Sequence, residues 1–323
     1  MIFDAHSDIW TDVTVHRLRG ETDVLKNRHL ARLRKGNVEG SIFVIWVDPP
    51  YDTDHLARTR QIMDAANAEI ASCDDIRVVH SYAEMQQAKA DGKLYVFLGV
   101  EGMAAIGEDL SLIDMYYDFG ARHAMLTWNE ENALATGARG NPDRGLTDLG
   151  RGAIRRMEDK RMLVDVSHLN EKSFWDVVKT ATKPICASHS NAKALCSAAR
   201  NLTDDQLRAV RDLDGVVGLN AFNLFVDDDP TKQDVAHLAR HAAHMIDVMG
   251  IEHVGCGFDF YEFLESETIG SMTDTGSPSV IGMEDASKIN CLFTELNKLG
   301  LTAREQELLS YENFQNLIRK TVG

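Results

Sequence analysis

Short, continuously apolar runs alternate with stretches of helical periodicity along the whole chain. The run at 41–47 contains Ile-Phe-Val-Ile-Trp-Val and is stopped by Pro49 and Pro50, which is typical of a strand covered on both faces. The segment 233–249 has apolar residues at helical spacing and ends at Gly250. The strand-like runs are 2–6, 41–47, 94–100, 123–128, 162–167, 184–188, 216–220 and 253–258. The pattern therefore predicts parallel strands that alternate with helices.

Eight such units in succession predict an α/β fold, a (β/α)8 or TIM barrel. We expect a single domain over residues 1–323, with a C-terminal helical tail from about 302 that opens with a capping box of Thr302 and Glu305. A doubly wound open sheet is the alternative, but no G-x-G-x-x-G follows the first strand. The short run at 76–80 falls outside the alternation, and we interpret it as an extra turn of chain.

Composition excludes some classes of partner. The 34 basic and 50 acidic residues give a net charge of −16, which argues against nucleic acid because phosphate binding needs a basic face. No apolar run approaches the ~20 residues of a membrane span, and we expect no signal peptide because candidate site residues begin at residue 6. We therefore expect no membrane partner. The five cysteines are odd in number and scattered, which predicts reduced thiols and a cytoplasmic location.

Ligand-type side chains stand where several predicted strands end. They are His6 and Asp8 after the first, Glu101 after the third, His168 after the fifth, His189 after the sixth and Asp259 after the eighth. Because all strands of a TIM barrel end at the same face, these imidazoles and carboxylates are expected to converge. Nitrogen and oxygen ligands without thiolates suit Zn²⁺, with Mn²⁺ or Co²⁺ as alternatives. Six groups exceed the needs of one tetrahedral zinc, so we expect two metals that activate water for hydrolysis.

Five ordered motifs spread over nearly the whole chain resemble those of one family. They are Asp4-Ala-His6-Ser-Asp8, Gly99-Val-Glu101-Gly102, Val164-Asp-Val-Ser-His168, Ala187-Ser-His189-Ser-Asn191 and Arg200-Asn201-Leu202. This set is similar to that of the renal or membrane dipeptidases, binuclear zinc enzymes of the amidohydrolase superfamily. The resemblance implies a TIM barrel of the metal-dependent hydrolase type. The resemblance implies that His6 and Asp8 bind one zinc, that His168 and His189 bind the other, and that Glu101 bridges the two.

The resemblance also implies a reaction. A metal-bridging hydroxide would attack the peptide bond of a dipeptide, and Asp259 would carry the proton from that water to the leaving amine. Arg200 would bind the C-terminal carboxylate of the substrate, which a guanidinium group fits well. Members of the family often tolerate a D-residue at the C-terminal position.

Three positions depart from the family pattern. Trp128 stands where animal members carry a substrate-contacting His, and Phe222 stands near a position where many members have Tyr. We expect both side chains to contact the substrate and to change its preference. After Asp259 the chain reads Phe260-Tyr261, where many members read Phe-Asp-Gly. We also expect neither the secretory nor the anchoring end of the animal enzymes.

Two other functions remain as alternatives. The first is a different amidohydrolase that acts on a lactone, a cyclic amide or a deaminase substrate, and the second is a non-catalytic barrel used for binding. Arg200 favours a dipeptidase, and so does the absence of a Lys on the fourth strand, where the superfamily commonly has its bridging group.

The loop 261–282, with Gly270, Gly276, Ser277 and Pro278, is expected to shape the pocket or to contact a neighbouring subunit. The oligomeric state stays open, a homo-oligomer included.

Several other polar residues have structural interpretations. His237, His241 and His244 share one face of a helix, which we interpret as a packing or solvent face. His123, at the start of a predicted strand, is expected to be structural. We expect Asp4 and Asp165 to orient metal-binding histidines, to face a helix or to form salt bridges. Arg200 has an alternative partner in Asp204.

Overall fold

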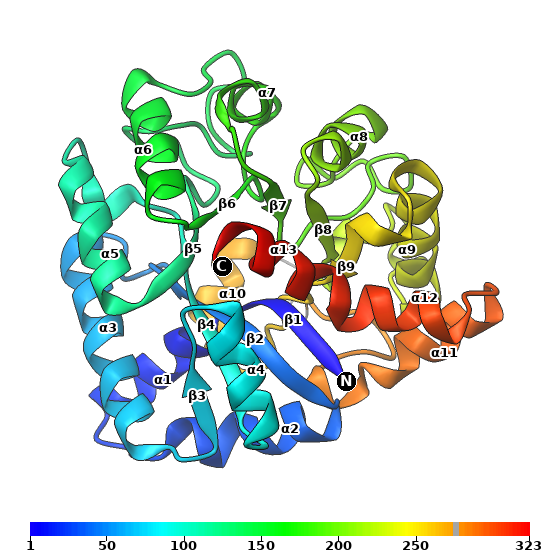
Figure 1. The fold of residues 1–323 in the computed structure, drawn as a ribbon, viewed down its shortest axis with the longest axis horizontal. Helices are drawn as coiled ribbons and strands as arrows, with labels where there is room; N and C mark the ends of the chain where they lie inside the picture. Colours follow the sequence, from blue (N-terminus) through cyan, green and yellow to red (C-terminus); the bar gives the residue numbers. More distant parts are fainter. Residues whose placement is uncertain (274–277) are drawn as a thin grey trace.

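The computed structural model describes residues 1–273 and 278–323 and shows a nearly closed barrel of parallel strands surrounded by helices (Figure 1). The barrel strands follow one another in the order β1 (Ile2–Ser7), β2 (Val38–Trp46), β4 (Leu94–Glu101), β5 (Ala121–Met125), β6 (Leu163–Asp165), β7 (Ile185–Ala187), β8 (Val216–Leu219) and β9 (Val254–Cys256). The predicted TIM barrel is confirmed. The doubly wound alternative is wrong, because the strand order never reverses along the sheet.

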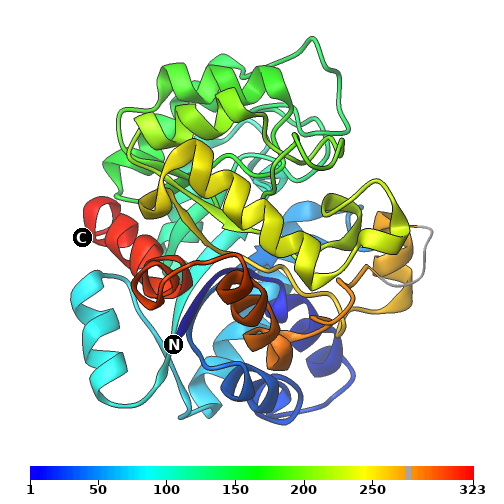
Figure 2. The same cartoon turned by 90° about the vertical axis from the view of Figure 1, so that its right-hand side faces the viewer.

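Helices cover the outside of the barrel and its ends (Figures 1 and 2). Their bounds are α1 (Ile9–Leu18), α2 (Leu30–Lys35), α3 (His55–Ser72), α4 (Tyr82–Ala90), α5 (Ile113–Phe119), α6 (Asp148–Asp159), α7 (Glu171–Thr180), α8 (Asp204–Asp212), α9 (Val235–Met249), α10 (Ser266–Met272), α11 (Asn290–Lys298), α12 (Ala303–Glu307) and α13 (Asn313–Thr321). Within the described residues, no helix is long and apolar enough to cross a membrane.

The interpretation of 76–80 as an extra turn of chain was wrong. Ile76–Val78 forms β3, which pairs in parallel with β4 outside the barrel path. Its partners are residues 94–96 of β4, whereas β5 pairs with residues 98–100. β3 therefore occupies the edge of β4 that β5 leaves unpaired. A strand of three residues is too short to show a clear apolar pattern.

The two ends of the sheet, β1 and β9, are joined by a side chain. Asp4 in β1 accepts a hydrogen bond from the main-chain N–H of Phe258 at 2.8 Å, and the main-chain N–H of His6 lies 3.5 Å from the same oxygen. Asp4 is buried. Both of these bonds come from main-chain N–H groups, so they are neither a salt bridge nor a contact with the His6 ring. Asp4 instead fixes the backbone that carries His6 against the last strand.

The C-terminal segment closes the amino end of the barrel. Thr302 and Glu305 form the expected capping box at the start of α12. Further on, the Asn313 side chain donates to the main-chain oxygens of Ile251 and Val254 at 2.6 and 2.7 Å.

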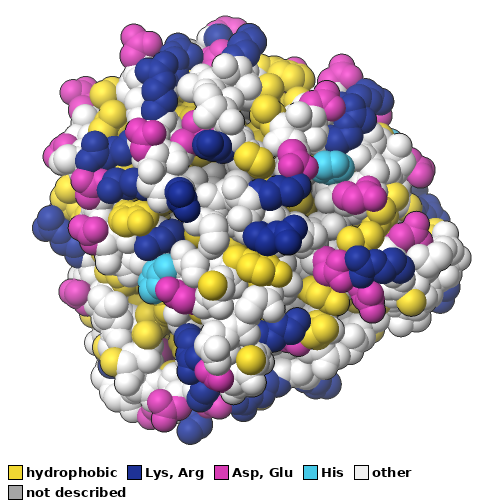
Figure 3. Space-filling model, in the orientation of Figure 1, with side chains coloured by type: hydrophobic (Ala, Val, Ile, Leu, Met, Phe, Trp, Pro, Cys, Tyr) yellow, Lys and Arg dark blue, Asp and Glu magenta, His cyan; other side chains and the backbone are white. Residues whose placement is uncertain are grey.

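α13 and the N-terminus lie at one end of the molecule, and α10 lies at the other (Figure 2). On the face around α13, acidic and basic side chains are interspersed (Figure 3). The candidate site lies at the opposite end, where the carboxyl ends of the strands meet.

All five cysteines are free, as the sequence predicted. Cys186 and Cys256 are buried in β7 and β9, where they act as small core residues.

Candidate metal centre and substrate cavity

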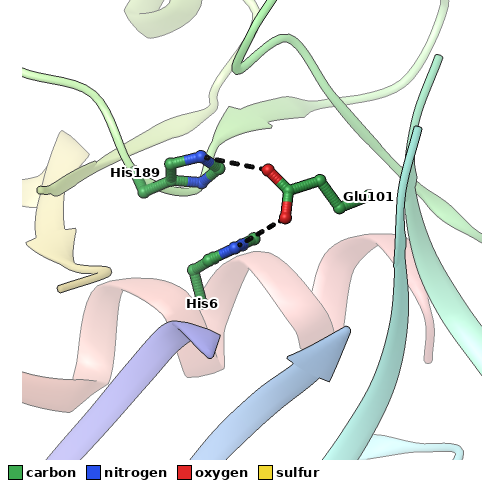
Figure 4. Close-up of side chains that lie close together, drawn as sticks. All are labelled: His6, Glu101 and His189. Atoms are coloured by element: carbon green, nitrogen blue, oxygen red, sulfur yellow. Dashed lines mark ion pairs between the residues drawn. The ribbon is translucent and has the colours of Figure 1, made fainter. Parts of the chain in front are cut away.

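Glu101, the last residue of β4, has its two carboxylate oxygens facing different histidines (Figure 4). Oε2 lies 3.2 Å from Nε2 of His6, whereas Oε1 lies 2.7 Å from Nε2 of His168 and 3.8 Å from Nε2 of His189. Asp8 is on the His6 side, with its Oδ2 3.6 Å from Nε2 of His6. The carboxylate thus lies between two groups of ligand-type side chains, as the bridging role requires.

Hydrogen bonds fix which nitrogen of His168 and His189 faces the centre. Nδ1 of His168 lies 2.9 Å from Oδ1 of Asn129, and Nδ1 of His189 lies 2.9 Å from the hydroxyl of Ser188. The Nε2 atoms of the two rings are 2.8 Å apart. An imidazole whose Nδ1 is bonded in this way presents Nε2 to a metal ion.

Two of the converging residues have a left-handed backbone. His168 has φ 69° and Asp259 has φ 58°, and each follows the end of its strand, β6 or β9. Residues other than Gly adopt this conformation rarely, and it is concentrated at functional sites. The turns direct both side chains into the mouth of the barrel.

The buried site carries an excess of negative charge. Burial, with the Glu101 carboxylate, raises the pKa of Asp8 to about 6. Burial raises the pKa of Asp259 to about 7, and the Asp8 and Glu101 carboxylates add to the shift. Burial opposes the charged form of His6, yet Glu101 and Asp259 raise its pKa well above the usual value. A cluster with these properties is stabilised by a bound cation.

Unpaired polar atoms point to the same conclusion. Among the residues that the structure describes, neither ring nitrogen of His6 nor Oδ1 of Asp8 has a hydrogen-bond partner, although all are buried. Such atoms are costly to bury unless something binds them. Imidazole nitrogens and carboxylate oxygens without thiolates form a donor set that fits Zn²⁺, and also Mn²⁺ or Co²⁺. The residues present therefore fit a metal centre.

A cavity of about 210 Å³ opens onto this centre. The predicted residues on its wall are Asp8, Glu101, Trp128, His168, Arg200, Phe222 and Asp259. His6 and His189 are fully buried and reach the centre from behind this wall. The structure thus brings all the predicted site residues together. The other lining residues are Trp46, Asn129, Ala138, Arg139, Ala199, Leu224, Phe225, Tyr261 and Met272.

Arg200 is a buried cation on the cavity wall. Its Nη2 donates to the main-chain oxygen of His189 at 3.2 Å, and its Nε has no hydrogen-bond partner within residues 1–273 and 278–323. The alternative pairing with Asp204 is wrong, because Asp204 lies 2.8 Å from Nε2 of His244 on α9. The free donor capacity of Arg200 is therefore available to an anionic group in the cavity.

Sequence reasoning missed Asn129 as a member of the site, and it named Tyr261 only as a departure from the family pattern and as the start of the loop 261–282. Asn129 directly follows Trp128, and Tyr261 comes two residues after Asp259, so their proximity to predicted site residues was a usable signal. The Tyr261 hydroxyl donates to Oδ2 of Asp259. Met272 reaches the cavity from α10, inside the loop predicted to shape the pocket. Gly276 and Ser277 of that loop lie outside the described residues.

His123 and Asp165 form a buried pair beneath the site. Nε2 of His123 lies 2.7 Å from Oδ2 of Asp165. The sequence predicted His123 at the start of a strand. That position was wrong, because β5 begins at Ala121 and His123 lies in its middle. A Cβ on Gly99 would lie 2.6 Å from Nδ1 of His123, so only Gly leaves room for this ring.

The three histidines of α9 contact protein groups, in agreement with their structural interpretation. His241 is fully buried and bonds the main-chain N–H of Ala192 and the main-chain oxygen of Val226. His237 bonds Asp234, and His244 bonds Asp204.

A TIM barrel with these side chains at the carboxyl ends of its strands defines a metal-dependent hydrolase. The chain belongs to the membrane dipeptidase family, peptidase family M19, whose family model matches residues 1–322. It is 36% identical over 225 residues to an uncharacterized protein from the pqqA 5′ region of Klebsiella pneumoniae, covering 67% of this chain and 82% of the relative.

Two solved structures share the fold over nearly their full length. One is a metallo peptidase from Rhodobacter sphaeroides liganded with a phosphinate mimic of the dipeptide L-Ala-D-Ala, with 26% identity and a TM-score of 0.86 over 99% of both chains. The other is dipeptidase AC, a metallo peptidase of family M19, with 26% identity and a TM-score of 0.86 over 100% of this chain and 99% of the other. The family and these neighbours make the protein a metal-dependent hydrolase of the dipeptidase type.

Proposed function

We propose that the protein is a binuclear zinc dipeptidase that accepts a D-residue at the C-terminal position of its substrate. The observation that carries the proposal is the placement of Glu101, with one carboxylate oxygen facing His6 and the other facing His168 and His189. His6 and Asp8 would hold one zinc ion, His168 and His189 would hold the second, and Glu101 would be shared. The two ions would lower the pKa of a water molecule between them and polarise the scissile carbonyl.

Asp259 is the proposed proton carrier. Its Oδ1 lies 3.7 Å from Nε2 of His6, and the carboxylate faces the cavity. As the water oxygen bonds to the carbonyl carbon, Asp259 takes a proton from the water. It then gives this proton to the amide nitrogen as the C–N bond breaks, and it returns to a carboxylate. Such proton transfer typically contributes about 10²–10⁴-fold to the rate.

Arg200 is the proposed binding group for the C-terminal carboxylate of the substrate. It is buried, it faces the cavity, and its Nε is unpaired among the described residues, so a carboxylate would satisfy it. Trp128 and Phe222 form part of an apolar wall and would contact the substrate side chains. The bound L-Ala-D-Ala mimic in the R. sphaeroides neighbour supports a D-residue at the C-terminal position. We further propose a cytoplasmic enzyme with no nucleic-acid or membrane partner, on the basis of its acidic charge and free cysteines.

The first experiment measures hydrolysis of L-Ala-L-Ala, L-Ala-D-Ala and L-Ala-D-Ala amide by zinc-loaded protein, with a chelator-treated control. We expect cleavage of both free dipeptides, loss of activity with the chelator, and weak activity on the amide. Metal analysis of the same sample should give two zinc ions per chain. Two bound zinc ions without turnover on any dipeptide would contradict the proposal and favour another amidohydrolase substrate, such as a lactone or a cyclic amide.

A further inference from the structure

One oxygen of the Asp259 carboxylate accepts hydrogen bonds from two neutral donors. Nδ2 of Asn220 lies 3.0 Å from Oδ2, and the hydroxyl of Tyr261 donates to the same oxygen. Oδ1 receives neither bond and lies 3.7 Å from Nε2 of His6. The two oxygens of this carboxylate therefore have different surroundings.

The orientation of the Asn220 amide is fixed by the main chain. Its Oδ1 accepts the main-chain N–H of Phe222 at 2.6 Å, so the NH₂ group is the one that faces Asp259. The main chain of Asn220 is held in turn by the Asn191 side chain, which accepts from its N–H at 3.0 Å and donates to its oxygen at 2.9 Å. Asn220 follows β8 and is fully buried. It is a rigid donor.

The Tyr261 ring is held by packing. Its centroid lies 5.1 Å from that of Phe222, and the two ring planes meet at 76°, which is the edge-to-face arrangement. Tyr261 is buried but lines the cavity beside Asp259. A fixed ring delivers its hydroxyl to one place, so the bond to Oδ2 restrains rotation of the carboxylate.

We propose that Tyr261 and Asn220 are positioning residues for proton transfer. Their hydrogen bonds occupy Oδ2 of Asp259, so Oδ1 is the oxygen that carries the proton. This inference rests on the proposed function. An O–H bond of the attacking water breaks as its oxygen bonds to the carbonyl carbon, and the proton passes to Oδ1. The proton then passes to the amide nitrogen as the C–N bond breaks, which restores the carboxylate. Without the Tyr261 hydroxyl the carboxylate rotates more freely and delivers the proton less often.

The test uses the zinc-loaded enzyme and the variant Tyr261→Phe, which keeps the ring that packs against Phe222. The substrates are L-Ala-D-Ala and its ester analogue L-Ala-D-lactate, which present the same carboxylate but differ in the leaving group. An amine must be protonated to leave, whereas an alkoxide needs the proton less. We expect kcat on the peptide to fall about tenfold or more with KM within about threefold of wild type, and kcat on the ester to fall much less.

Two controls separate positioning from other roles. Tyr95→Phe removes a buried hydroxyl that is bonded to Gln315 near the start of β4, and we expect no change in kinetics. A phosphinate mimic of L-Ala-D-Ala has no leaving amine, so its affinity for Tyr261→Phe, measured by calorimetry, should match that for wild type. Zinc content and the thermal unfolding temperature of Tyr261→Phe should also match.

Different failures are distinguishable. Unchanged kcat in Tyr261→Phe, or an equal loss on peptide and ester, would overturn the positioning role while dipeptide hydrolysis by the wild type still supports the proposed function. Weaker binding of the phosphinate mimic would assign the hydroxyl to substrate contact instead. Absence of dipeptide hydrolysis by the zinc-loaded wild type would overturn the proposed function, and this inference with it.

Discussion

Asp165 and His123 form a buried pair whose carboxylate also holds the chain next to two candidate metal ligands. Besides the 2.7 Å contact with His123, Asp165 accepts the main-chain N–H of Ser167 at 2.8 Å and that of Ser188 at 3.2 Å. Ser167 precedes His168, and Ser188 precedes His189. Burial opposes the charged form of Asp165, yet the bonds from His123, Ser188 and Ser167 hold its pKa well below the usual value. The carboxylate thus links β5 to the ends of β6 and β7.

We expect Asp165→Asn to weaken zinc binding as well as stability. An amide cannot accept all of these hydrogen bonds, and breaking a buried pair costs about 3–5 kcal/mol of unfolding free energy. Displaced histidines should lower zinc affinity by about 10–100-fold, measured by competition with a chelator. Asp12→Asn is a matched control, because Asp12 is a buried carboxylate bonded to Arg28 and His29. It should lose stability but keep zinc affinity. Equal zinc affinity in both variants would limit Asp165 to a role in stability.

We expect Asp259→Asn to keep both metal ions and to lose most of its turnover. The amide is nearly isosteric but cannot carry the proton, so kcat on L-Ala-D-Ala should fall about 10²–10⁴-fold. Steady-state kinetics and metal analysis on the same preparation check this. Full activity of the variant would remove Asp259 from the mechanism, whereas loss of zinc together with activity would make it a metal ligand.

We expect Arg200→Met to reduce kcat/KM on free dipeptides by on the order of 100-fold, because charge-assisted hydrogen bonds to the carboxylate are lost. The same variant should lose much less on L-Ala-D-Ala amide, which has no carboxylate to bind. Wild type and variant measured on both substrates form a double-mutant cycle that isolates this contact. An equal loss on the free and the amidated dipeptide would show that Arg200 acts on the fold of the site instead.

We expect His241 to make the protein less stable in acid. Burial lowers the pKa of His241 to about 4, while the bond to the Val226 oxygen and the charge of Asp227 oppose the shift. The unfolded chain takes up this proton near pH 6.5 and the folded chain only near pH 4. The contribution is therefore fully present above pH 6.5 and is lost as the pH falls from 6.5 to 4, by up to about 3 kcal/mol.

Urea unfolding of wild type and His241→Gln between pH 7 and pH 4 measures this contribution. The variant should be less stable at pH 7, and the difference should shrink as the pH falls. His237→Gln, on the same face of α9 but partly exposed, is the control for loss of a histidine side chain and should cost less stability at pH 7. A constant difference between wild type and His241→Gln at all pH values would contradict the prediction.

We expect replacement of residues 262–282 by a short Gly-Ser linker to change the dipeptide preference. Met272 lines the cavity, and Arg139, which also lines it, donates to the main-chain oxygens of Ser271 and Met272. Losing this wall should alter the ratios of kcat/KM among dipeptides with small and large side chains. Light scattering on the same variant shows whether the loop also contacts a neighbouring subunit. Unchanged kinetics together with an unchanged oligomeric state would contradict the prediction.

The sequence by itself determined the barrel and the convergence of its ligand-type residues. Both are local signals: long apolar runs such as 41–47 mark buried parallel strands, and in a barrel every strand ends at the same face. His6, Glu101 and His189 could therefore be placed together from their positions at strand ends. The sequence did not predict β3, because a strand of three residues is too short to show a clear apolar pattern.

Only the tertiary structure decided how the site is supported. The bonds of Asp165 to His123, of Asn220 to Asp259 and of His241 to Ala192 join residues that are 42, 39 and 49 positions apart. No periodicity links such positions, because their distance depends on how neighbouring strands and loops pack. The same holds for the cavity wall, which combines Trp46 at the end of β2 with Met272 from α10. Strand ends, set by local pattern, locate the chemistry, and packing between distant segments sets its geometry.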